Sequence, residues 1–171
     1  MAFTGSRVAL LLRPRLLRGP CSLLTRGMAA GSPQEVSTRE QLAPDGVLRY
    51  STLLSSGRHT LYSDLMPAAH GGDTGPSPKE LALLALGACT SMTVRQFADA
   101  SKWPLRAVRC TVREHCGEGK HLPTGLSLTV HLDAPELTEA QRGRLLRVAE
   151  RCPVKQMLSG GLVDGITTTL V

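Results

Sequence analysis

Aromatic residues are scarce in this chain of 171 residues. Phe, Tyr and Trp together make up 3 % of the sequence, with two Phe, two Tyr and one Trp. Proteins that bind single-stranded nucleic acid without sequence preference stack bases on such rings, so the composition argues against that class. A hydrophobic core with so few rings has to be filled by Leu, Val, Ala and Met.

An uninterrupted apolar run long enough to cross a membrane is also lacking. A membrane-spanning helix needs about 18 or more apolar residues, and the longest runs here are broken by Arg, Pro or Gly. We therefore expect no membrane span. With 42 % hydrophobic and 20 % charged residues, the chain has the composition of one globular domain.

Acidic residues are missing from the start of the chain. The first is Glu35, and five arginines precede it: Arg7, Arg13, Arg15, Arg18 and Arg26. Without these five, 15 basic residues face 14 acidic ones, so the formal net charge of +6 belongs mostly to this leader. The rest of the chain lacks the basic surplus of a nucleic-acid-binding surface, and we expect no nucleic-acid partner.

The leader has the composition of a mitochondrial transit peptide, being rich in Arg, Ser and Leu and free of acids. A secretory signal needs an apolar stretch of about 7–15 residues, and the one from Val8 to Leu12 ends at Arg13. The sequence predicts a transit peptide over 1–30, a linker over 31–46, one domain over 47–171, and a location in the mitochondrial matrix. Translation from Met28 would instead give a cytosolic form.

Metal-binding motifs are missing as well. The five cysteines are Cys21, Cys89, Cys110, Cys116 and Cys152; no CxxC or HExxH motif occurs. We therefore expect no zinc site. Both compartments considered keep thiols mostly reduced, so a structural disulfide framework is not expected.

The pattern of apolar residues predicts an α+β domain with the element order ββ-α-ββ-α-β. The expected elements are a hairpin with strands over 47–55 and 59–66, a long helix over 77–101, alternating strands over 105–116 and 126–132, a helix that opens at Thr138, and a last strand over about 162–171. A Gly- and Pro-rich passage over 70–76 separates the hairpin from the long helix.

The long helix has clear start and stop signals. Ser77 can be its N-cap, with Pro78 in the first position and Glu80 completing a capping box. It should end before Trp103-Pro104, because Pro disfavours helical geometry in the preceding residue. Residues 81–89 are apolar on every side of the helix. We therefore expect burial all round, by a sheet on one side and by a second subunit on the other.

Two cysteines lie at apolar positions of the predicted helices. Cys89 is mid-helix between small residues, so a substrate can approach its thiol closely, and Cys152 directly precedes Pro153. Free cysteines are most often small hydrophobic core residues, so spacing alone leaves chemical and packing roles open for both. Cys110 and Cys116 are expected to be packing or surface thiols.

Two segments resemble the motifs of one family. The segment TGPSPKELALLALGACTSMT over 74–93 resembles the central-helix signature of the OsmC/Ohr family, the organic hydroperoxide reductase superfamily. AERCPV over 149–154 resembles its second cysteine motif. Trp103-Pro104-Leu105 and the closing segment over 166–170 fit as well, and the similarity covers about residues 47–171.

The resemblance implies a fold and an activity. The family folds as an intertwined homodimer in which two long, buried central helices are clasped by antiparallel sheets. Its peroxidase members reduce organic hydroperoxides without metal, haem or flavin. In that chemistry Cys89 becomes a sulfenic acid and Cys152 condenses with it to a disulfide. A dithiol, which is a lipoyl group in the Ohr branch, then reduces the pair, so a lipoylated protein is an expected partner.

The implied chemistry needs a cation near Cys89, because only the thiolate is nucleophilic and burial raises a thiol's pKa. In the peroxidase branch an arginine held by a glutamate supplies it. Here Arg58 and Glu80 are the expected residues, although Lys79 stands where that branch has its glutamate. Arg49 and Lys79 are further candidate cations. Arg58 could equally be an exposed turn residue, and Glu80 a helix cap.

Two other functions stay open beside the peroxidase. A Cys89–Cys152 pair that oxidises slowly would suit a redox-sensing or binding protein with the same fold. Two inert core thiols would make the chain a structural paralogue. Turnover of an organic hydroperoxide with a dithiol reductant distinguishes the three.

Overall fold

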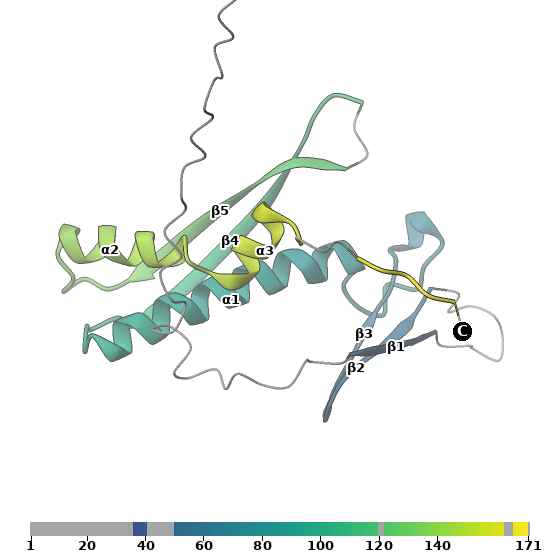
Figure 1. The fold of residues 1–171 in the computed structure, drawn as a ribbon, viewed down its shortest axis with the longest axis horizontal. Helices are drawn as coiled ribbons and strands as arrows, with labels where there is room; N and C mark the ends of the chain where they lie inside the picture. The colour runs from purple at the N-terminus through teal and green to yellow at the C-terminus, as the bar shows by residue number, and fades with distance from the viewer. Residues whose placement is uncertain (1–35, 41–49, 120–121, 163–165, 171) are drawn as a thin grey trace, which may run out of the picture. The chain divides into compact units, whose positions relative to one another are not determined.

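The computed structural model describes residues 36–40, 50–119, 122–162 and 166–170, which form an α+β domain (Figure 1). These residues make two antiparallel sheets and three α-helices, in agreement with the predicted fold class. The predicted transit peptide, the candidate cation Arg49 and the first residues of the predicted hairpin lie outside the described part of the chain.

A three-stranded antiparallel sheet comes first. Its strands, in spatial order, are β1 (Ser37–Glu40), β2 (Thr52–Ser56) and β3 (His59–Ser63). The β2–β3 hairpin confirms the prediction with shorter strands, and Gly57 in its turn has a φ of 55°, which glycine adopts without steric cost. The strand β1 lies in the stretch predicted to be a linker. Its four residues are all exposed, so only its pairing with β2 reveals it.

One buried carboxylate holds the Gly- and Pro-rich passage after β3. Asp64 is 2 % exposed. Its carboxylate accepts hydrogen bonds from the N–H groups of Leu65 (2.7 Å), Gly72 (3.1 Å) and Thr74 (3.2 Å) and from the Thr74 hydroxyl (2.9 Å). Burial raises the pKa of Asp64, but these hydrogen bonds outweigh it and hold the pKa below its ordinary value of 3.8. The carboxylate thereby fixes the passage that leads into the long helix.

The long helix α1 (Pro78–Ala100) begins and ends as predicted. The Ser77 hydroxyl accepts from the N–H of Glu80 at 3.3 Å, and the Glu80 carboxylate accepts from the N–H of Ser77 at 2.8 Å. These two hydrogen bonds complete the capping box. At its other end Ser101 is the C-cap, just ahead of Trp103-Pro104.

One face of α1 packs on a two-stranded antiparallel sheet (Figure 1). Its strands are β4 (Ala107–Cys116) and β5 (Pro123–Asp133), which confirm the two predicted alternating strands. At Gly87 the helix approaches β4 closely enough that an added Cβ would lie 3.6 Å from the Val112 side chain and 3.8 Å from the Cys110 Cβ. Cys110 on β4 therefore faces α1.

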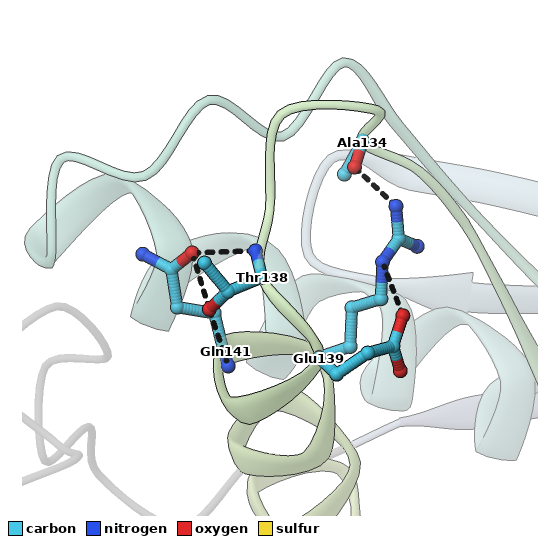
Figure 2. Close-up of polar contacts among 5 residues, drawn as sticks. Ala134, Thr138, Glu139 and Gln141 are labelled. Carbon is cyan, nitrogen blue, oxygen red and sulfur yellow. Dashed lines mark hydrogen bonds and ion pairs between the residues drawn. The ribbon is translucent and has the colours of Figure 1, made fainter.

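The helix α2 (Glu139–Ala149) packs on α1. It begins as predicted, at the polar contacts around Thr138 that Figure 2 shows. The Thr138 hydroxyl accepts from the N–H of Gln141, and the Gln141 side chain accepts from the N–H of Thr138. Arg142 donates to the carbonyl of Ala134 and lies 3.7 Å from the Glu139 carboxylate. The core between the elements consists of Val94, Ala98, Leu105, Ala134, Leu137, Leu145 and Ala149.

Two predictions about the C-terminal part are corrected. A third helix, α3 (Pro153–Gly160), follows Cys152, because Pro153 does not merely end α2 but takes the first position of a new helix. The last strand, predicted over 162–171, is wrong for the described residues 162 and 166–170. Ile166 and Leu170 are 86 % and 98 % exposed, and no described strand of this chain pairs with them.

The apolar part of α1 is covered on some sides only. Residues Leu86 and Thr90 are buried, whereas Leu84 is 59 % exposed and Met92 is exposed as well. Within the described residues the sheet covers one side of α1 as predicted, and the cover expected from a second subunit stays a prediction. By length and composition α1 also satisfies the requirements for a membrane-crossing helix, which core helices of soluble proteins satisfy too.

Candidate active site

The two cysteines of the recognised motifs come from different helices. Cys89 lies near the middle of α1 and is partly exposed. Cys152 is wholly buried at the junction between α2 and α3, where it is the N-cap of α3. Both α2 and α3 pack on α1. The fold thereby brings together two thiols that are far apart in the sequence.

The two cysteine side chains come close together where α3 packs on α1. Each thiol shifts the pKa of the other. Both are free thiols, so the arrangement is that of the reduced protein. The Thr90 side chain and the backbone N–H groups of Val154 and Lys155 also approach Cys152, although its sulfur makes no complete capping hydrogen bond to α3.

The surroundings move the two pKa values in opposite directions. Burial raises the pKa of Cys89, and contact with Cys152 raises it further, which outweighs the N–H of Val154 and the Thr93 hydroxyl. Burial also raises the pKa of Cys152, but the Thr90 hydroxyl, the Cys89 thiol and the two N–H groups at the start of α3 lower it overall. Polar contacts therefore offset burial more at Cys152 than at Cys89.

The predicted activating residues lie elsewhere in the single chain. Arg58 is exposed in the β2–β3 turn, and the Glu80 carboxylate is engaged in the capping box of α1. The Lys79 ammonium lies 2.8 Å from the Glu114 carboxylate on β4, and this contact raises the pKa of Lys79. Within the described residues, no lysine or arginine side chain is a leading influence on the pKa of Cys89. The catalytic roles of Arg58 and Glu80 stay predictions.

Two hollows flank α1 near these residues. One, of about 460 Å³, lies between α3, β5 and α1 and has Leu86, Leu128 and Lys155 in its lining. The other, of about 610 Å³, lies between α1 and β4 and contains Cys110 in its lining. The first hollow and the pair Cys89–Cys152 are both on the side of α1 that faces α3. Cys110 lines the second hollow, on the side that faces β4.

Sequence reasoning missed the groups that surround Cys152. The Thr90 side chain and the N–H groups of Val154 and Lys155 influence the Cys152 thiol only because α3 follows it and packs on α1. The sequence signal for α3 is Pro153, because proline is typical of the first position of a helix. A cysteine in the N-cap position next to that proline is the pattern that could have identified it.

Comparison with protein families matches residues 71–164 to the family model described as OsmC-like protein. The chain belongs to the OsmC-like family. A comparison with curated proteins finds no match.

Solved OsmC-like structures share the fold. An OsmC-like protein from Mycoplasma pneumoniae has a TM-score of 0.60 and 20 % identity, covering 82 % of this chain and 98 % of its own. An organic hydroperoxide resistance protein OsmC from Legionella pneumophila has a TM-score of 0.55 and 17 % identity, covering 75 % and 90 %. One from Elizabethkingia anophelis has a TM-score of 0.55 and 15 % identity, covering 78 % and 93 %. At these identities the likeness shows the fold.

Proposed function

We propose that this OsmC-like protein is a thiol peroxidase that reduces organic hydroperoxides. The observation that carries the proposal is the closeness of two free thiols from separate helices, one partly exposed and one buried. Two neighbouring thiols are what a peroxidase that forms an intrachain disulfide requires. Membership of the OsmC-like family supports the same chemistry, since two of the structures with this fold are called organic hydroperoxide resistance proteins.

The proposed reaction uses the exposed thiol first. The Cys89 sulfur attacks the terminal oxygen of the hydroperoxide, the O–O bond breaks, and an alcohol leaves after it takes up a proton. Cys89 is then a sulfenic acid. The Cys152 sulfur attacks this sulfur, the thiol proton goes to the departing hydroxyl group, and a disulfide and water form. A dithiol reductant, for which a lipoylated protein is proposed, takes the two oxidising equivalents and restores both thiols.

We further propose that the working protein is a homodimer. Leu84, Ala88 and Met92 follow one another at intervals of four residues and are exposed along one side of α1. A second subunit that covered this side would bury the apolar helix as its sequence predicts. The composition of the leader supports a location in the mitochondrial matrix, which imaging of the full chain with a C-terminal fluorescent tag would test.

Hydroperoxide turnover by the full chain tests the activity. We expect saturable consumption of cumene hydroperoxide with dihydrolipoamide as reductant. Cys89→Ser should abolish it, whereas Cys110→Ser, on the other side of α1, should retain it. Consumption that is unchanged in Cys89→Ser would refute the proposal.

Mapping of the oxidised protein tests the pairing. One equivalent of a mild oxidant should give an intrachain disulfide between Cys89 and Cys152. A peptide that links Cys89 to Cys110 or Cys116 instead would contradict the proposed resolving role of Cys152.

A redox-sensing protein is the second candidate. It is favoured by the pKa of Cys89, which burial raises with no lysine or arginine among the leading influences in the described chain. Such a thiol reacts slowly. Formation of the disulfide without repeated turnover in the presence of dihydrolipoamide would identify this function.

A further inference from the structure

The helix α2 and the turn that ends it carry three exposed arginines. Arg144, Arg147 and Arg151 follow one another at intervals of three and four residues, which places them along one side of a helix. The N–H of Arg151 donates to the carbonyl of Val148 at 2.9 Å, so the turn continues as far as this residue. We call these three residues the arginine stripe.

Two guanidiniums of the arginine stripe are held by neighbouring groups. The Cζ atom of Arg144 lies 5.5 Å from the centroid of the Phe97 ring on α1, a contact that fixes the direction of the side chain. A Cβ added at Gly143 would lie 3.8 Å from Nη1 of Arg147, so this guanidinium lies back along the helix toward Arg144. The two positive charges are thereby positioned next to each other.

No acidic side chain balances the arginine stripe among the residues that the structure describes. None of its three arginines forms an ion pair there, and the neighbouring acids Glu139 and Glu150 pair with Arg142 and Lys155 instead. The helix dipole favours a basic residue in the last turn of α2, but like charges at these intervals repel one another. The stripe is therefore a surface of one sign, which an external anion would neutralise.

The rest of α2 favours a carboxylate partner over a membrane. A helix that lies in a membrane surface exposes an apolar face beside its basic one. In α2 the apolar residues Leu145, Val148 and Ala149 are buried. The planar guanidinium of arginine binds a carboxylate through two parallel hydrogen bonds. An acidic protein segment therefore fits the stripe.

The arginine stripe ends at the cysteine pair. Arg151 directly precedes Cys152, and both α2 and α3 pack on α1, which carries Cys89 (Figure 1). In the proposed cycle the hydroperoxide is a small molecule, whereas a reductant carried on a protein needs a surface on which to dock. A protein bound along the stripe would have its edge beside the disulfide.

We propose that the arginine stripe binds an acidic segment of the protein that carries the reducing dithiol, and so places this dithiol at the Cys89–Cys152 disulfide. The unpaired charges of the stripe and its position next to Cys152 carry this inference. The inference rests on the proposed function, because that function supplies the disulfide to be reduced.

The reduction step balances. The first thiol of the reductant loses its proton, its sulfur bonds to the partly exposed Cys89 sulfur, and the bond between Cys89 and Cys152 breaks. The second thiol then displaces Cys89 and closes the disulfide of the reductant. Two electrons pass to the cysteine pair, and the two thiol protons of the reductant end on Cys89 and Cys152.

Direct binding tests the surface without any peroxide. The probe is a fluorescently labelled polyglutamate peptide, followed by anisotropy on the full chain in its dithiol form, with the leader arginines replaced by Gln in every sample so that the leader does not bind the probe. Arg147→Gln with Arg151→Gln should weaken binding at least about fivefold. Arg109→Gln with Arg113→Gln removes two exposed arginines from β4 and is the matched control, which should bind like the parent.

The outcomes of this binding experiment separate the alternatives. Arg147→Lys with Arg151→Lys keeps the charge and should keep most of the binding, which a disrupted helix would not. A parent that does not bind the peptide, or equal losses in the two Gln variants, would overturn the proposal. Loss of binding to phosphatidylserine vesicles in Arg147→Gln with Arg151→Gln, without any effect on peptide binding, would overturn it in favour of a membrane surface.

Reduction kinetics test the role of the stripe in the cycle. The Cys89–Cys152 disulfide is formed with a mild oxidant and reduced by a glutamate-rich peptide that carries a dithiol. Reduction should be at least about fivefold slower in Arg147→Gln with Arg151→Gln than in the β4 control, whereas the uncharged dihydrolipoamide should reduce both at the same rate. Equal rates with the acidic peptide would overturn the proposal. If the parent consumes no hydroperoxide, the peroxidase proposal fails, while peptide binding still decides whether the stripe is a docking surface.

Discussion

The Thr90 hydroxyl faces two acceptors in the interior of the protein. It donates to the carbonyl of Leu86 at 2.9 Å, and it also lowers the pKa of Cys152. One O–H proton serves one strong acceptor at a time, so ionisation of Cys152 should draw the hydroxyl away from the helix backbone. We therefore expect Thr90 to influence the ionisation of Cys152.

Replacement of Thr90 by Val removes the donor and keeps the shape of the side chain. We expect the titration of the Cys152 thiolate to move to higher pH, because a group that lowers its pKa has been lost. Thr93→Val removes a hydroxyl that acts on Cys89 instead and is the matched control. Equal thiolate titrations for the two variants would refute this role, and Thr90→Ser should restore the parent profile.

Asp64 gives the second prediction at this scale. Its folded pKa is lowered below 3.8, so its contribution to stability is present above that pH and is lost as the pH falls toward the folded pKa. Asp64→Asn should lower the urea midpoint clearly at pH 7, because an amide cannot accept from all four donors. The difference in urea midpoint between Asp64→Asn and the parent should become smaller in acid, where Asp64 of the parent becomes protonated. Asp73→Asn, exposed in the same loop, should leave both midpoints unchanged; a gap independent of pH would contradict the prediction.

Single elements differ in how much of them the sequence determines locally. The capping box of α1 and the pair Thr138–Gln141 are specified by neighbouring residues, so both helix starts could be predicted. The exposed strand β1 and the helix α3 depend on contacts with distant parts of the chain, and their own residues carry weak signals. The site shows the same contrast. Both motif cysteines could be identified from the sequence, whereas the role of the N–H groups beside Cys152 could not, because it depends on the presence of α3.

The loop before α1 tolerates no side chain at Gly71. A Cβ there would lie 1.9 Å from the backbone oxygen of Leu65, so the chain would have to move. Gly71→Ala should reduce the free energy of unfolding by about 1–3 kcal/mol, as overpacking usually does. Gly125→Ala on β5, with nothing within 4 Å of the added Cβ, is the control for chemical denaturation. Equal midpoints for the two variants would argue against the close packing of this loop.

At the scale of the whole molecule, the long helix α1 exposes part of its apolar surface. The apolar positions of α1 predict burial on all sides, and among the described residues β4, α2 and α3 cover three of its faces. No local pattern specifies which chain supplies the missing cover. The predicted C-terminal strand, which is wrong for the described residues 162 and 166–170, has a related origin. High β-propensity alone does not provide a neighbouring strand to pair with.

Sedimentation tests the proposed dimer. The parent should sediment with the mass of two chains at micromolar concentration, and Leu84→Glu should shift it to one, because a carboxylate in an apolar interface is strongly unfavourable. Leu146→Glu is the matched control, since Leu146 is 58 % exposed on α2 and Leu84 is 59 % exposed on α1. A parent with the mass of one chain would contradict the proposal.

Cys152 is the residue at which α2 gives way to α3. A covalent bond from this joint to the middle of α1 would close a large ring of backbone and restrict the freedom of the unfolded chain. Oxidation should therefore raise the free energy of unfolding by about 2–4 kcal/mol. Calorimetry with and without a reducing agent would measure this as a higher melting temperature of the oxidised protein. The melting temperature would thus distinguish the disulfide form of the protein from the dithiol form.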